Sequence, residues 1–132
     1  MRSGGFTLVE LMIAVAILAI VAAVAMPLYN QYSQRTYRSE AQADLMACAQ
    51  GLERYAAQNF SYAGADTSFP DGICDPESED QGRYDITVNI PNDNEFTLTA
   101  SPVSGGVMEG TGDLTYNHAG ERTWDGEDGW EE

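Results

Sequence analysis

A single carboxylate stands inside an apolar stretch near the start of this 132-residue sequence. Glu10 lies within residues 6–26, and from Leu11 to Met26 every side chain is apolar. A charge near the centre of a bilayer costs about 3 kcal/mol or more, and a buried charge normally has a partner. Glu10 is therefore predicted to pair with a positive group when the segment leaves the lipid.

The apolar stretch is long enough to cross a membrane. As a helix that rises about 1.5 Å per residue, residues 6–26 would reach roughly 31 Å. One alternative is a secretory signal peptide cut after Ala23-Val24-Ala25. A single basic residue at Arg2, the long apolar run and the carboxylate within it argue against that reading. A plain single-pass anchor explains the length but gives Glu10 no role.

The residues around Glu10 form a motif. The string GFTLVE at residues 5–10 follows a short basic leader, precedes the apolar run, and resembles the class III signal of type IV pilins. Pro27 matches the helix-interrupting proline of that family and is predicted to kink the helix where it leaves the membrane. About the first 30 residues match the family residue by residue. Beyond them, only the predicted order of helix, loop and antiparallel strands is similar. The resemblance is strongest toward minor type IVa pilins of the PilE type.

The resemblance implies a processing and assembly route. A prepilin peptidase/N-methyltransferase would cut between Gly5 and Phe6 and would methylate the new amine of Phe6. This ammonium would then pair with Glu10 of a neighbouring subunit, which favours assembly and fixes the axial register.

The same resemblance implies an organisation in three parts: a leader at residues 1–5, a transmembrane and assembly helix at 6–26, and a periplasmic or extracellular head at 27–132. The subunit is expected to cross the inner membrane once before assembly and to join an extracellular pilus (fimbrium) afterwards. Its expected partners are other pilin subunits, the peptidase/N-methyltransferase, the inner-membrane pilus assembly machinery and, before assembly, the inner membrane.

The charge of the chain argues against nucleic acid as a direct partner. The formal net charge is −15, and the six basic residues are all arginines. Beyond residue 60 the acidic residues are opposed only by Arg83 and Arg122. Such a surface repels phosphate backbones.

Beyond the apolar run, the pattern predicts a helix and then strands. Apolar residues recur every three or four positions along one helical face, while Arg35, Arg38 and most other charges lie off it and Gly51 weakens the middle. The face comprises Tyr37, Ala41, Leu45, Cys48, Leu52 and Tyr55. Residues 60–82 are predicted to form a long structured loop.

Alternating apolar residues follow the loop and predict antiparallel strands. They are Tyr84, Ile86, Val88 and Ile90, then Phe96, Leu98 and Ala100 after a turn at 91–94, then Leu114 and Tyr116, and a last short strand toward Trp124. The expected fold class is α+β: a long N-terminal helix packed on three or four antiparallel strands.

The two cysteines offer a cross-link. Cys48 on the helix face and Cys74 in the loop could close a ring of about 27 residues, worth roughly 3 to 4 kcal/mol in an oxidising compartment. Two free thiols are the alternative. In many pilins the cysteine pair instead brackets a C-terminal loop, and residues 124–132 contain no cysteine.

Other chemistry is weakly supported. The acidic residues Asp71, Asp75, Glu77, Glu79 and Asp80 lack the spacing of a known calcium loop, so no metal is predicted. Nor do Asp125, Glu127 and Asp128 suggest one. His118 has no catalytic partner in a recognisable pattern and is expected to be a surface turn residue. No enzyme activity and no cofactor are predicted.

Together these features predict a structural subunit of a type IV pilus, minor-pilin-like, which supports adhesion, twitching motility or DNA uptake. The alternative is a pseudopilin of a type II secretion system, which shares the same N-terminus. A calcium-binding C-terminal loop would favour the pseudopilin, and the sequence shows no such loop.

Overall fold

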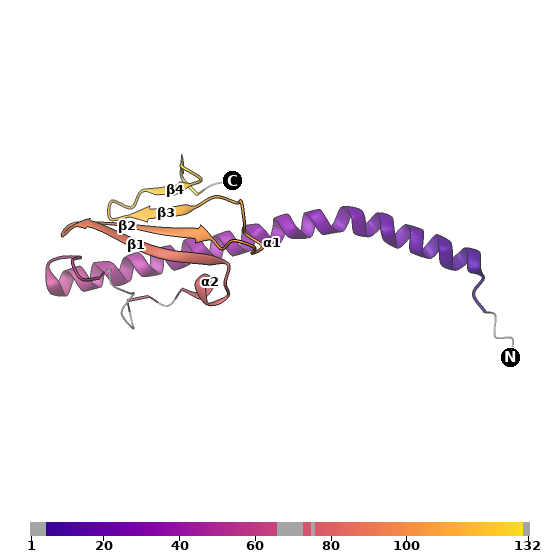
Figure 1. Cartoon of the computed structure of the whole chain (residues 1–132), viewed down its shortest axis with the longest axis horizontal. Coiled ribbons are helices and arrows are strands. Elements are labelled where there is room, and N and C mark those ends of the chain that lie inside the picture. Colours follow the sequence, from indigo (N-terminus) through magenta and orange to yellow (C-terminus); the bar gives the residue numbers. More distant parts are fainter. Residues whose placement is uncertain (1–4, 66–72, 75, 131–132) are drawn as a thin grey trace. The chain divides into compact units, whose positions relative to one another are not determined.

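The computed structural model describes residues 5–65, 73–74 and 76–130. The chain divides into two compact units, Met1–Arg35 and Thr36–Glu132. The helix α1 (Leu8–Asn59) begins in the first unit and ends in the second, which also holds the short helix α2 (Glu77–Asp80) and one sheet (Figure 1). The predicted α+β class, a long helix with an antiparallel sheet, is confirmed.

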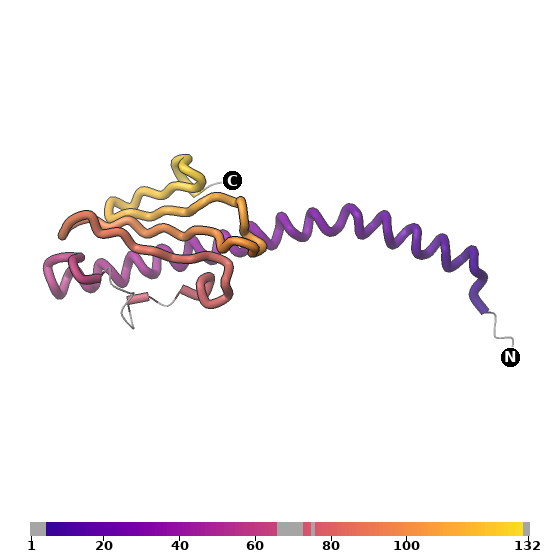
Figure 2. Tube along the Cα trace, viewed as in Figure 1, coloured from indigo at the N-terminus to yellow at the C-terminus, as the bar shows by residue number. Residues whose placement is uncertain are grey.

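Five antiparallel strands follow one another across the sheet in chain order. They are β1 (Tyr84–Asn92), β2 (Glu95–Pro102), β3 (Leu114–Asn117), β4 (Arg122–Trp124) and β5 (Glu127–Asp128). Because each strand pairs with the next one along the chain, the sheet is a meander, which the tube in Figure 2 follows from orange to yellow.

Two turns differ from the sequence prediction. The sequence analysis placed a turn at 91–94, whereas β1 continues to Asn92 and the register shifts between Asn89 and Asn92. Pro91 lies in this irregular stretch, and it has no N–H group to donate to a ladder. At the other side of the sheet, Asp125 and Gly126 have φ of 52° and 84°, which suits a tight hairpin and adds the fifth strand.

The core of the second unit lies between α1 and one face of the sheet. The predicted helical face is confirmed, with its four central residues completely buried and Tyr37 and Tyr55 packed at its margin. The completely buried four are Ala41, Leu45, Cys48 and Leu52. The predicted strand alternation is confirmed by the buried side chains of Tyr84, Ile86, Phe96, Leu98, Ala100 and Leu114.

The predicted loop at 60–82 contains one element that the sequence analysis did not anticipate. The single-turn helix α2 lies just before β1 and buries Ser78. Residues 66–72 and 75, and with them Asp71 and Asp75 of the weighed calcium loop, lie outside the described residues.

Candidate assembly site and the head that supports it

Reciprocal hydrogen bonds between Thr7 and Glu10 close the first turn of α1. The carboxylate oxygen Oε2 of Glu10 accepts hydrogen bonds from the Thr7 amide and from Thr7 Oγ1, both at 2.8 Å. Thr7 Oγ1 accepts one in turn from the Glu10 amide at 3.2 Å. This arrangement is a capping box, which satisfies N–H groups that have no partner inside the helix.

The sequence analysis missed this second role of Glu10. The signal was present, because the pattern T-x-x-E directly before an apolar run is the sequence signature of a capping box. The carboxylate therefore has a partner within its own chain before it meets another subunit. Its pairing with the Phe6 amine of a neighbour stays a prediction.

The helical residues after Glu10 present an apolar surface that nothing in the described chain covers. Phe6 is 90% exposed, and every large apolar residue from Leu8 to Leu28 is 55–73% exposed. By length and composition, α1 is able to cross a membrane. An exposed apolar surface of this extent marks a contact with lipid or with other protein.

The predicted processing residues flank the start of the helix. Gly5 and Phe6 precede α1 and are exposed. Pro27 lies inside α1, which continues on both sides of it. Cleavage, methylation and the kink stay predictions.

In the second unit, three α1 side chains spaced four residues apart hold the segment that leads into β1. The pairs are Cys48 with Cys74 in a disulfide, Asp44 with the Ser78 amide and hydroxyl, and Glu40 with Arg83 in an ion pair. The predicted disulfide is thereby confirmed. Residues four apart lie on one side of a helix, so the contacts form a row along α1, the tether row.

Gly51 lies beside the tether row, where the segment comes very close to the helix. A Cβ atom on Gly51 would lie 2.8 Å from the carbonyl carbon of Ile73 and 2.9 Å from its Cγ2. The carbonyl oxygen of Ile73 would be nearer still. Gly51 was interpreted as a weak point of the helix, and the structure shows that the contact requires it.

The sequence analysis placed Arg38 off the apolar face of α1 and did not anticipate its burial. Its side chain is buried, and its guanidinium carbon lies 3.8 Å from the ring centroid of Trp124. A desolvated cation over a tryptophan face is attracted by about 2 kcal/mol, which offsets part of the cost of burying the charge. The periodicity of α1 could not reveal this contact, because Trp124 is distant in the sequence.

Other arginines of the second unit are also in contact with rings. Arg83 stands over Tyr37 at 3.7 Å from the centroid, and Arg122 lies 5.1 Å from that of Trp130. Arg54 is exposed on α1. Most of the positive charge in the described part of the head is thus held against aromatic rings.

Shifted pKa values in the head arise mainly from burial. Burial and a hydrogen bond to Glu53 raise the pKa of Tyr62 to about 12. Burial also raises the pKa of Tyr84. Burial, then the charges of Asp85 and Asp80, raise the pKa of Glu79. Both tyrosines therefore stay protonated at neutral pH.

Among the described residues, the structure brings together no metal-binding cluster. No cluster of three or more His, Cys, Asp or Glu side chains suited to a metal occurs there. His118 is exposed in the turn after β3, as predicted, with its ring 6.4 Å from that of Phe96.

Comparisons with known families match nearly the whole chain. Residues 1–26 match the prokaryotic N-terminal methylation motif. Residues 27–115 match a family model described as type IV minor pilin ComP, DNA uptake sequence receptor.

Similar curated proteins are major pilins. A type IV major pilin protein PilE1 of Neisseria gonorrhoeae is 36% identical over 104 residues, which cover 78% of this chain and 45% of that protein. A type IV major fimbrial protein FimA of Dichelobacter nodosus is 41% identical over 107 residues, which cover 80% of this chain and 64% of that protein. The chain thus spans about half to two thirds of the length of these relatives. It belongs to the type IV pilin family.

Proposed function

We propose that this chain is a structural subunit of a type IV pilus. Residues 6–26 would anchor it in the inner membrane, a prepilin peptidase would cut between Gly5 and Phe6 and methylate Phe6, and the assembly machinery would then draw the subunit into the fibre. The observation that carries the proposal is the capped, exposed apolar helix with Glu10 in its first turn. The match to the methylation motif supports the processing step.

The first test is the N-terminus of the protein from sheared fibres. Mass spectrometry should find a chain that begins at a methylated Phe6. An uncut N-terminus, or a terminus after Ala25, would contradict the proposal.

The second test separates the two roles of Glu10. Glu10→Gln retains an oxygen that can accept the hydrogen bonds from Thr7 but removes the charge, whereas Glu10→Ala removes both. Both variants should be cut normally and should fail to enter fibres, because the inter-subunit pair needs the charge. Normal assembly of the glutamine variant together with failure of the alanine variant would show that the cap, not the charge, is required.

The head is proposed to act by assembling rather than by catalysis. Pilin families are non-enzymatic in general. Purified fibres should therefore show no hydrolytic activity beyond that of fibres carrying an unrelated pilin.

Direct DNA contact is a second candidate, because the matching family model is described as a DNA uptake sequence receptor. The charge opposes it: the chain carries −15 formally, and three head arginines stack on rings. We propose that any role in DNA uptake is exerted through the fibre. Fluorescence anisotropy with a labelled duplex at low salt, where electrostatic attraction is strongest, should show no binding. Saturable binding that Arg54→Ala abolishes would establish a DNA-receptor role for the head.

The pseudopilin alternative is tested in a strain from which the gene for this chain has been deleted. Loss of surface fibres with normal protein secretion supports the pilus subunit. Loss of secretion with normal fibres would assign the chain to a type II secretion system.

A further inference from the structure

The outer face of the sheet carries a row of hydroxyl groups that the strand register produces. Thr87 pairs with Thr99, Thr99 with Thr115, and Thr115 with Thr123. The row ends at Asp128, the partner of Thr123 on β5. Neighbouring strands lie about 4.8 Å apart, so four threonines and one carboxylate stand side by side on the face that points away from the core.

A cavity of about 530 Å³ opens on this face, with lining residues from β2, β3, β4 and β5. Its polar side chains include Thr97, Thr115, Asn117, Glu121, Thr123 and Asp128. No described lining residue is apolar or aromatic. The volume lies within the range of small-ligand sites, about 300–1,000 Å³.

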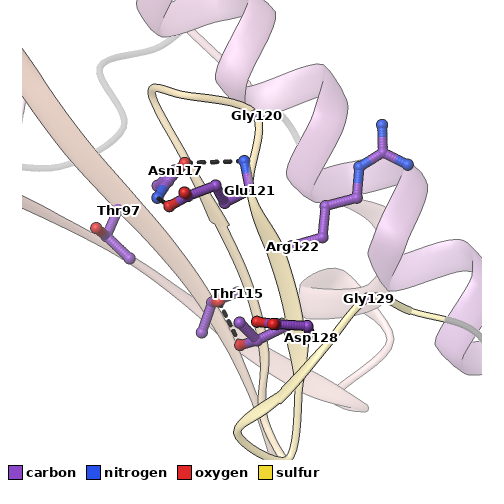
Figure 3. Close-up of a pocket in the computed structure, with 9 residues that line it drawn as sticks. Thr97, Thr115, Asn117, Gly120, Glu121, Arg122, Asp128 and Gly129 are labelled. Atoms are coloured by element: carbon purple, nitrogen blue, oxygen red, sulfur yellow. Dashed lines mark hydrogen bonds between the residues drawn. The ribbon is translucent and has the colours of Figure 1, made fainter.

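The side chains of the cavity are held in place by bonds among themselves. Thr115 Oγ1 and Thr123 Oγ1 are 2.6 Å apart, and Asn117 Nδ2 donates to Glu121 Oε2 at 2.6 Å (Figure 3). Asn117 Oδ1 accepts the Glu121 amide at 3.0 Å. A ligand would therefore meet preorganised groups, which lowers the entropic cost of binding.

The cavity is negatively charged although an arginine borders it. Figure 3 shows Arg122 extending away from Thr97 and Thr115, and its guanidinium lies against the Trp130 ring. Glu121 and Asp128 keep carboxylate oxygens for a ligand. Glu121 stands two residues before Thr123, roughly 7 Å along the strand, so the two charges flank the hydroxyl groups.

This lining selects a class of ligand. The apolar part of the lining comes from threonine methyl groups and glycines rather than from large apolar side chains, which suits the C–H faces of a polar molecule better than a wholly apolar ligand. A phosphate or carboxylate ligand would be repelled by Glu121 and Asp128. Threonine hydroxyls and the asparagine amide both donate and accept hydrogen bonds, which suits a molecule rich in hydroxyl groups. The carboxylates complement positive charge.

We propose that this cavity binds an amino sugar, an oligosaccharide whose free amines are protonated. The carboxylates of Glu121 and Asp128 hold the ammonium groups, and the threonine hydroxyls bond the sugar hydroxyls. The site does not depend on pilus assembly, because the unassembled chain contains every residue in it.

The test titrates the full-length chain in detergent micelles with three probes: a β-1,4-linked glucosamine tetramer, its fully N-acetylated counterpart and spermidine. A mildly acidic buffer keeps the sugar amines protonated. Calorimetry should give a dissociation constant on the order of 1 mM or tighter for the glucosamine tetramer. The acetylated sugar lacks the charge and spermidine lacks the hydroxyls, so both should bind at least about tenfold more weakly.

Matched variants locate the site. Glu121→Gln and Asp128→Asn keep shape and remove one charge each, and each should weaken binding about three- to tenfold. Asp85→Asn makes the same change on β1, outside the cavity, and should leave binding unaltered. Unchanged tryptophan fluorescence confirms that each variant is folded.

Four results would overturn the proposal: no binding of the glucosamine tetramer, equal binding of its acetylated counterpart, equal binding of spermidine, or an effect of Asp85→Asn as large as that of Asp128→Asn. A failure of fibre assembly in cells has no bearing on these titrations, so the proposed function and the sugar site are tested separately.

Discussion

Replacing Gly51 by alanine sets two effects of opposite sign against each other. In a helix interior, alanine is favoured over glycine by about 1 kcal/mol. Against this, the new methyl group would lie 2.8 Å from the carbonyl carbon of Ile73, and overpacking of this kind costs about 1–3 kcal/mol. We expect the contact to dominate, so that Gly51→Ala lowers the free energy of unfolding by up to about 2 kcal/mol.

The disulfide supplies the decisive control. Ile73 is adjacent to Cys74, which the bond to Cys48 holds against α1. In a variant with serine at both cysteine positions, Ile73 can move away from the helix. Gly51→Ala should then stabilise the head by up to about 1 kcal/mol. The sign of the effect should therefore reverse between the two backgrounds, with a coupling free energy of about 1–3 kcal/mol.

The assay is urea unfolding of the full chain in detergent, followed by the fluorescence of Trp124 and Trp130, which both lie in the second unit. Gln50 is exposed next to Gly51, and its alanine and glycine variants measure the helix preference alone. Stabilisation by Gly51→Ala in both backgrounds would refute the steric argument.

Three further predictions concern the cap, the disulfide and one carboxyl group. Thr7→Val removes the capping hydroxyl and should cost the first turn of α1 about 1 kcal/mol, seen as faster amide exchange there in micelles; unchanged exchange would refute the cap. Serine at Cys48 and Cys74 should lower the free energy of unfolding by about 3.5 kcal/mol, because the bond closes a sequence separation of 26 residues. A loss below about 1 kcal/mol would mean that the bond does little to restrict the unfolded chain. Burial and two nearby carboxylates raise the pKa of Glu79 above its ordinary 4.5, so the folded state holds that proton more tightly and loses stability as the pH rises through this range. Glu79→Gln should thus stabilise the head at neutral pH by a few tenths of a kcal/mol and have no such effect well below pH 4.5; an equal gain at both pH values would contradict this.

Periodicity made much of the head predictable. A spacing of three and four residues identified the buried face of α1, and the alternation from Tyr84 to Ala100 identified the first hairpin, because both patterns follow directly from backbone geometry. The fifth strand was missed because Glu127 and Asp128 are polar and exposed. The adjacent Asp125-Gly126 pair was the local signal for it.

The assembly motif was predictable for a different reason. The motif GFTLVE is contiguous in the sequence, so it can be recognised without knowing any tertiary contact. The Thr7–Glu10 cap within it is also local, because it follows from the T-x-x-E spacing alone. The burial of Arg38 and the close approach at Gly51 depend on Trp124 and Ile73. Contacts of this kind depend on how segments distant in the sequence pack together. Local sequence patterns do not predict that packing. The outer cavity likewise depends on the pairing of four strands, β2 to β5.

The tether row has a mechanical consequence. In the proposed fibre, tension directed along α1 would load the row lengthwise, because its members Glu40, Asp44 and Cys48 follow one another along the helix. Links arranged along the direction of pull share the load and yield together, whereas links arranged across it open one at a time. A covalent link at one end of the row therefore limits the extension of its two weaker neighbours. The segment before β1 should in consequence behave under load as a brace that returns to its place when the pull stops.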